Sequence, residues 1–312
     1  MSFSMLQVVK QCNSVTNADS VAESEGHYWL KHGGSKVGLV SAKDITALEQ
    51  ACQEHEQAVF DIDHSTRTLR FSASLASQES RSSAVAALLT EMRAKQSWAS
   101  LLKWRDELYP IYGSNGELVA MVERAASYTF GIRTFGVHIN GIVQGSNGET
   151  RMWVAKRSAT KQTWPGYLDQ IVAGGIGNGM GAGESVIKEC SEEAGIPEHL
   201  ARAAKSAGTV QYFARSELGF LPETQLVYDL ELPQGFVPQP ADGEVQEFYL
   251  WTMDQVVDGV RQGLFKPNCA LCVVDFLVRH GYLTPENESD YLEIFDNMHC
   301  PLPFPGPILN KM

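Results

Sequence analysis

A glycine-rich loop that leads directly into an acidic helix, residues 174–196, constrains this chain more than any other segment. Glu189, Glu192 and Glu193 are spaced so that they fall within an arc of about 100° on one helical face. Like charges at this spacing repel and destabilise a helix unless something compensates for them. A hard divalent cation would do so, because Mg²⁺ takes oxygen ligands. The pattern therefore predicts a metal site on this helix.

The same segment resembles the Nudix box, Gly-x5-Glu-x7-Arg-Glu-U-x-Glu-Glu-x-Gly-U, in which U is a bulky apolar residue. The register fits without a gap from Gly174 to Ile196, and the three glutamates fall on the metal-facing positions of the family. Two positions depart from the pattern. Met180 stands where the first glutamate is expected, and Lys188 stands where the arginine is expected. Lysine keeps the positive charge but lacks the planar fork that can hold a carboxylate bidentately.

Further segments resemble one branch of this superfamily, which carries an N-terminal accessory domain and is fused to thiamine pyrophosphokinase in fungi. The segments that carry this resemblance are 104–109, 135–138, 157–161, 242–245 and 265–268. The resemblance implies hydrolysis of an organic diphosphate to monophosphate and phosphate, with thiamine diphosphate or its oxidised analogues as the expected substrate. It also implies Mg²⁺ as the cofactor, with Mn²⁺ as an alternative. The expected partner is thus a small-molecule diphosphate.

The resemblance also assigns roles to individual side chains. We expect Glu189, Glu192 and Glu193 to bind the metal, and Glu193 or Glu244 to act as the general base. The candidate substrate-binding residues are Arg157, Lys161, Gly174 and Gly175. An arginine or lysine can hold a phosphate by charge-assisted hydrogen bonds. The glycines would let the backbone pack close to the helix and the metal.

Two alternatives remain open at this point. A generic nucleoside-diphosphate-type pyrophosphatase would have the same box but would release two monophosphates. A non-catalytic diphosphate-binding sensor is suggested by the departures at Met180 and Lys188. A nucleotide-binding glycine turn is disfavoured, because the loop lacks the G-x-G-x-x-G order and no Gly-Lys-Ser/Thr follows it.

Charge and cysteine usage restrict the setting of the protein. The net charge of −12 argues against nucleic acid as the main partner. Six cysteines in 312 residues do not form a disulfide framework, and Cys269 and Cys272 lie in an apolar run typical of a buried helix. We find neither a secretory signal nor a segment of the length needed to span a membrane. We therefore expect a cytoplasmic protein without a membrane partner, and a homodimer is compatible with the sequence.

The length of the chain favours two domains. We expect an accessory α+β domain over residues 1–124, in which we identify no catalytic constellation. Residues 125–285 are expected to form the Nudix-type domain, of α+β or α/β class, with a mixed sheet sandwiched between helices. Residues 286–312 are rich in proline, and we expect an extended tail there.

Overall fold

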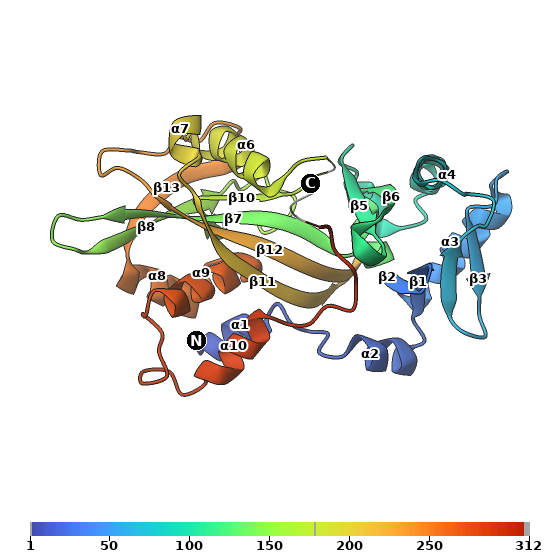
Figure 1. The fold of residues 1–312 in the computed structure, drawn as a ribbon, viewed down its shortest axis with the longest axis horizontal. Coiled ribbons are helices and arrows are strands. Elements are labelled where there is room, and N and C mark those ends of the chain that lie inside the picture. The colour runs from blue at the N-terminus through green and yellow to red at the C-terminus, as the bar shows by residue number, and fades with distance from the viewer. Residues whose placement is uncertain (1, 178, 309–312) are drawn as a thin grey trace.

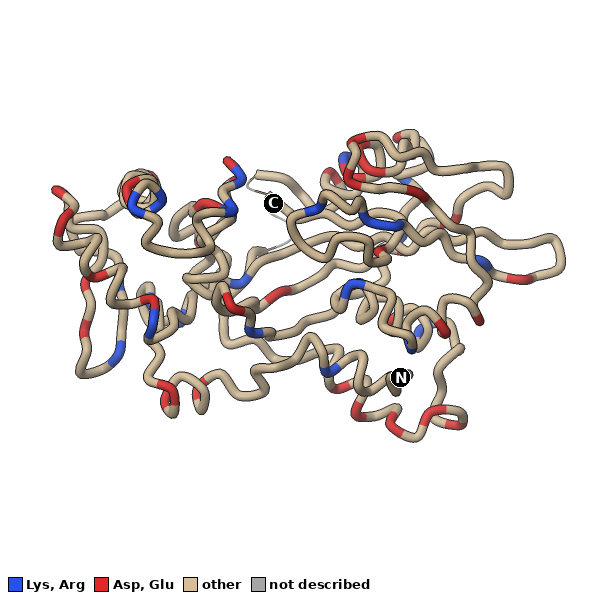
Figure 2. The backbone as a smooth tube through the Cα atoms, turned by 180° about the vertical axis from the view of Figure 1, so that it is seen from behind, with Lys and Arg blue, Asp and Glu red and all other residues tan. Residues whose placement is uncertain are grey.

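The computed structural model describes residues 2–177 and 179–308. Figure 1 shows two lobes side by side, one built around a large sheet and one around a small sheet, with the hairpin of β5 and β6 between them. Acidic and basic positions are interspersed along both lobes (Figure 2). Within the described residues, no helix combines the length and the apolar character that crossing a membrane requires.

The small N-terminal lobe contains a four-stranded sheet in the order β2-β1-β4-β3. Strands β1 and β2 are antiparallel, as are β3 and β4, whereas β1 and β4 run parallel. The elements of this lobe are α2 (Ala18–Glu25), β1 (Tyr28–His32), β2 (Ser35–Val40), α3 (Ala42–Glu54), β3 (Phe60–Asp63), β4 (Thr68–Phe71) and α4 (Gln78–Ala94).

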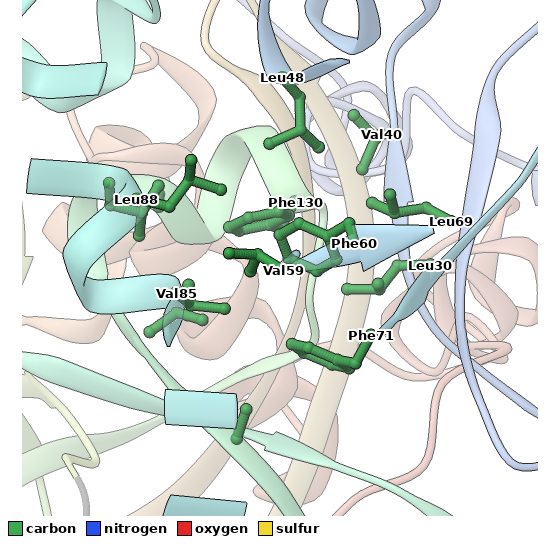
Figure 3. Close-up of a cluster of buried hydrophobic side chains, with 14 of the residues drawn as sticks. Leu30, Val40, Leu48, Val59, Phe60, Leu69, Phe71, Val85, Leu88 and Phe130 are labelled. Atoms are coloured by element: carbon green, nitrogen blue, oxygen red, sulfur yellow. The ribbon is translucent and has the colours of Figure 1, made fainter. Parts of the chain in front are cut away.

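A short connecting region joins the lobes. It comprises η1 (Ala99–Lys103), β5 (Leu108–Tyr112), η2 (Ser114–Gly116), β6 (Leu118–Glu123), η3 (Arg124–Ala126) and α5 (Ser127–Phe130). Phe130 inserts from α5 into the core of the small lobe, where it lies near Val59, Phe60 and Leu88 (Figure 3). Its ring centroid is 5.2 Å from that of Trp98 and 5.7 Å from that of Phe60. The connection is therefore anchored by apolar packing.

The large lobe is built on a seven-stranded mixed sheet with the path β11-β12-β7-β8-β13, to which β10 adds beside β7 and β9 beside β8. Strand β12 is parallel to β7, and the other pairs are antiparallel. Its elements are β7 (Thr134–Gln144), β8 (Thr150–Arg157), β9 (Leu168–Gln170), β10 (Val172–Gly175), α6 (Ala182–Ala194), α7 (Glu198–Ala201), β11 (Lys205–Ser216), β12 (Gly219–Glu231), β13 (Val245–Thr252), α8 (Met253–Arg261) and α9 (Pro267–Arg279).

Helices cover both faces of this sheet. Residues of α6 and α7 share one apolar cluster with Val137 and Ile139 of β7, and residues of α8 and α9 share another with Ile142 of the same strand. Cys269 and Cys272 are buried in α9, as the apolar run predicts. The expected fold class, a mixed sheet between helices preceded by a smaller α+β domain, is confirmed.

A helix near each end of the described chain packs onto the large lobe. Helix α1 (Met5–Lys10) contacts α8, α9 and α10 (Tyr291–Met298), and Figure 1 shows α1 and α10 side by side. The expected extended tail over 286–312 is wrong for residues 291–298. They form a helix because apolar residues at helical spacing, such as Ile294 and Met298, are buried against this core. The proline-rich residues 301–308 are not helical.

Gly131 offers a test of how tightly the lobes are joined. Its φ is +56°, and an added Cβ would lie 2.2 Å from the backbone oxygen of Leu39. We expect Gly131→Ala to lower the free energy of unfolding by about 2–5 kcal/mol, since backbone strain and steric overlap add. Gly33 is the matched control, with φ +55° and nothing within 4 Å. Gly33→Ala should cost only about 1–2 kcal/mol. Equal losses of unfolding free energy in the two variants, measured by urea unfolding, would contradict the close contact between Gly131 and Leu39.

Candidate active site

The acidic helix α6 is held in place by its ends and by its apolar side. The backbone N–H of Gly181 donates to Glu184 Oε2 at 3.2 Å, which satisfies a group at the helix start. The helix ends at Gly195, whose φ of +59° suits glycine in the left-handed region. Val186 and Cys190 are buried against the sheet. Glu189 and Glu193 lie on the side of the helix that faces β10, where Glu189 lies against Gly174 and Glu193 accepts from the N–H of Ala173.

Glu193 lies at the centre of a carboxylate cluster. One carboxylate oxygen each from Glu193, Asp242 and Glu244 lies within 4.8 Å of the others. Glu193 is buried, and its Oε2 accepts a hydrogen bond of 2.9 Å from the backbone N–H of Ala173. Burial raises the pKa of Glu193 well above its ordinary value, and the negative charge of Asp169 adds to the effect. Oxygen-only donors at this spacing suit a hard divalent cation, which would relieve the crowding of negative charge.

Glu189 and Glu192 lie on the same helix but are paired with Lys188. The Nζ of Lys188 is 3.0 Å from Glu189 and 2.8 Å from Glu192. Burial raises the pKa of Glu189, and the charges of Glu192 and Glu244 act in the same direction against the opposing effect of Lys188. A Cβ added to Gly174 would lie 2.3 Å from Cδ of Glu189, so the absence of a side chain on β10 lets this glutamate lie against the strand.

Arg157 and Lys161, the predicted phosphate-binding cations, are engaged by the protein. Arg157 donates to Asp169 at 2.7 Å and to the backbone oxygens of Thr163 and Trp164 at 3.0 and 3.1 Å. Lys161 Nζ donates to the carboxylate of Glu244. Burial alone would raise the pKa of Glu244, but the hydrogen bond and charge of Lys161 lower it, with smaller effects of Arg157 and Arg124. Both cations therefore position acidic groups, and their predicted role toward substrate stays a prediction.

Two acidic residues of this region were not among the predicted site residues. Asp242 belongs to the Asp-Gly-Glu turn before β13, where its Oδ1 accepts from the N–H of Glu244 at 2.8 Å. The short spacing of Asp242 and Glu244 was the available signal. Asp169 on β9 is fully buried and accepts from Arg157 and from Sγ of Cys269 at 2.7 Å. No periodicity in the sequence indicates that β9 packs against α9.

The region that connects the two lobes touches the glycine-rich loop directly. A Cβ added to Gly175 would lie 2.2 Å from the hydroxyl oxygen of Tyr109 on β5. One added to Gly177 would lie 3.9 Å from Oε1 of Glu107. The two glycines thus lack side chains for different reasons. Gly174 makes room for Glu189 of the acidic helix, and Gly175 makes room for Tyr109 of β5.

Comparisons with known proteins agree with this organisation. A family model described as the NUDIX domain matches residues 134–268, and one described as a domain of unknown function, DUF4743, matches residues 4–134. The uncharacterized protein YJR142W of Saccharomyces cerevisiae is 39% identical over 295 residues, which cover 90% of this chain and 85% of that protein. Nudix hydrolase 20, chloroplastic, of Arabidopsis thaliana is 43% identical over 196 residues. That match covers 62% of this chain and about half, 52%, of the length of the Arabidopsis protein.

A solved structure, the Nudix domain of Shewanella oneidensis NrtR complexed with ADP ribose, is 12% identical with a TM-score of 0.38. The alignment covers 49% of this chain and 91% of that one. At this TM-score the likeness has no bearing on function.

The uncharacterized Nudix hydrolase SCO1686 of Streptomyces coelicolor is 30% identical over 149 residues, which cover 40% of this chain and 80% of that protein. Together with the family model, this relative defines the class of protein, and the chain belongs to the Nudix family. It is a Nudix hydrolase, an enzyme acting on phosphoanhydride bonds, with an N-terminal DUF4743 domain.

The contact of Tyr109 with Gly175 can be measured. We expect Gly175→Ala to lower the free energy of unfolding by about 1–3 kcal/mol, because the added methyl group overlaps the phenolic oxygen. In the double variant with Tyr109→Phe, the loss of unfolding free energy should be at least about 0.5 kcal/mol smaller than the sum of the losses in the two single variants. Gly183→Ala on α6, where nothing lies within 4 Å, is the control and should be neutral or stabilising. Strict additivity of the pair would disprove the contact.

Proposed function

We propose that the protein hydrolyses an organic diphosphate to a monophosphate and phosphate with the help of Mg²⁺ or Mn²⁺. The observation that carries this proposal is the cluster of Glu193, Asp242 and Glu244 beside the acidic helix of a Nudix hydrolase. Thiamine diphosphate and its oxidised analogues are the substrates we propose first, on the resemblance of the outer segments to the thiamine-related branch. A cytoplasmic location, a homodimer and the absence of nucleic acid or membrane partners stay predictions.

Residues of the cluster would hold the metal together with Glu189 and Glu192. A bound Mg²⁺ would supply charge neutralisation for the diphosphate and would make a coordinated water more acidic. Lys188 lies between Glu189 and Glu192 and limits their mutual repulsion in the absence of a cation. The family pattern places an arginine here. The lysine of this chain makes one contact of 3.0 Å and one of 2.8 Å with the two glutamates.

Glu193 and Glu244 are the two candidates for the base that accepts the proton of the attacking water. Glu193 is buried among the other carboxylates of the cluster, whereas the hydrogen bond and charge of Lys161 lower the pKa of Glu244 and favour its ionised form. The water oxygen attacks the terminal phosphorus, and the bond from that phosphorus to the bridging oxygen breaks. The leaving monophosphate retains the bridging oxygen.

The reaction is tested by incubating the protein with Mg²⁺ and a panel of diphosphates. The panel includes thiamine diphosphate, its oxidised analogues, a nucleoside diphosphate sugar and a dinucleotide. We expect orthophosphate and one organic monophosphate, no product with excess EDTA, and recovery when Mg²⁺ or Mn²⁺ is restored. Two monophosphates without orthophosphate would instead assign the protein to the nucleotide-type pyrophosphatases. Absence of any product across the panel would refute the proposed reaction.

Single substitutions in the cluster test the roles of its members. We expect Glu193→Gln and Glu244→Gln each to lower turnover about 10²- to 10⁴-fold, because each removes a charged oxygen at the reacting centre. The unfolding midpoint should change little, since glutamine can still accept from the N–H of Ala173. Glu198→Gln on α7, an exposed glutamate paired with Arg202, is the control. Near-normal turnover in both cluster variants would rule out these roles.

A further inference from the structure

The cationic side chains closest to the carboxylates already form hydrogen bonds and ion pairs with the protein. Arg157 donates from all three of its nitrogens to protein oxygens. Lys161 is bonded to Glu244, and Lys188 to Glu189 and Glu192. A diphosphate brings several further negative charges into this acidic region. Binding of the diphosphate therefore requires a cationic side chain whose hydrogen-bond donors are not all bonded to the protein.

Arg124 meets this requirement from the side of the N-terminal domain. It lies at the end of β6, within the segment matched by the DUF4743 family model. Its Nη1 donates to Oε2 of Glu107 at 2.7 Å, and no acceptor within the described residues takes a hydrogen bond from its Nε or Nη2. The side chain of Arg124 is 36% exposed.

The neighbours of Arg124 place it over the glycine-rich loop. Its guanidinium carbon lies 5.3 Å from the ring centroid of Tyr109, the residue whose hydroxyl meets Gly175. Its partner Glu107 faces Gly177. Arg124 also lines a cavity of about 30 Å³ between the domains, together with Tyr109, Tyr128, Thr134 and Glu223. A cavity of this volume holds about one or two water molecules and is too small for an organic group.

The backbone at Arg124 is fixed on both sides. Its own N–H donates to the backbone oxygen of Glu107 at 2.7 Å. The buried carboxylate of Glu123 accepts from the N–H groups of Arg105 and Ala125 at 2.8 and 3.1 Å. The guanidinium is thus held before a ligand arrives, which reduces the entropy lost on binding.

We propose that Arg124 binds a phosphoryl group of the substrate, so that the N-terminal domain completes the substrate site of the Nudix domain. This inference rests on the proposed function and adds a residue and a role for the accessory domain. The guanidinium would donate from Nε and Nη2 to two oxygens of one phosphoryl group. Glu107 and Tyr109 position the guanidinium over the loop that precedes the acidic helix.

The test uses methylenediphosphonate, a hydrolysis-resistant diphosphate, titrated calorimetrically into the full chain with Mg²⁺. We expect Arg124→Gln to weaken binding roughly 10- to 100-fold, as for the loss of a charge-assisted pair of hydrogen bonds. Arg124→Lys should lie between this variant and the unchanged protein, because it keeps the charge and loses the fork. Unfolding midpoints identify a variant that fails to fold, and Arg124→Lys then decides the result.

Two matched variants distinguish a direct contact of Arg124 with the substrate from a structural role of Arg124 beside the β5–β6 hairpin. Glu107→Gln removes the ionic partner that positions Arg124 and should weaken binding by a smaller factor than Arg124→Gln does, because the guanidinium and all of its donors remain. Arg70→Gln alters an exposed arginine on β4 of the same domain and should leave binding unchanged. Equal losses in Glu107→Gln and Arg124→Gln, or normal binding in Arg124→Gln, would overturn the proposal.

Parallel turnover measurements keep this inference distinct from the proposed function. Phosphate release that persists in Arg124→Gln at an unchanged KM would refute the role of Arg124 and leave the hydrolysis standing. Binding that depends on Arg124 in a protein that cleaves none of the diphosphates would support the role of Arg124 and refute the hydrolysis.

Discussion

Electrostatic crowding of carboxylates in a partly buried space is the constraint on which the site depends. Glu193 is buried beside Asp242, Glu244 and the charge of Asp169. Such an arrangement is costly unless cations or donors balance it. Several features of the structure serve that balance: the N–H of Ala173, the ammonium groups of Lys161 and Lys188, and the guanidinium of Arg157. A fold organised only for stability would not concentrate acidic groups in this way.

Local sequence patterns predict the elements of this fold well. The helices and hairpins carry apolar residues at the spacing of buried faces, and the glycine-rich loop precedes a helix bearing three glutamates, as the box predicts. The sequence pattern does not predict helix α10, because its short apolar pattern lies next to a proline-rich segment and its packing against α1 and β11 stabilises it. Pattern reasoning is weakest where a short element depends on contacts distant in sequence.

In the candidate site, too, the sequence predicts what depends on local spacing and does not predict contacts between distant segments. The helix glutamates follow from spacing alone, but their pairing with Lys188 depends on side-chain conformations that spacing does not specify. Arg157 and Lys161 are predicted to hold a phosphate, yet they donate hydrogen bonds to Asp169 and Glu244. Tyr109 approaches Gly175 through the docking of a hairpin more than sixty positions earlier in the sequence. Contacts of this kind are properties of tertiary packing.

The position of α1 has a consequence for how the accessory domain is attached. Because α1 packs into the core of the large lobe, the chain leaves that lobe after α1, forms the small lobe and returns through α5. The small lobe is therefore tethered at two points, like an insertion, and Phe130 pins one of them. Two tethers restrict hinge rotation more than a single linker would. Deleting the first domain from the N-terminus would also strip Met5, Val8 and Val9 from the core of the catalytic domain, so such a truncation would report on stability as well as on the missing domain.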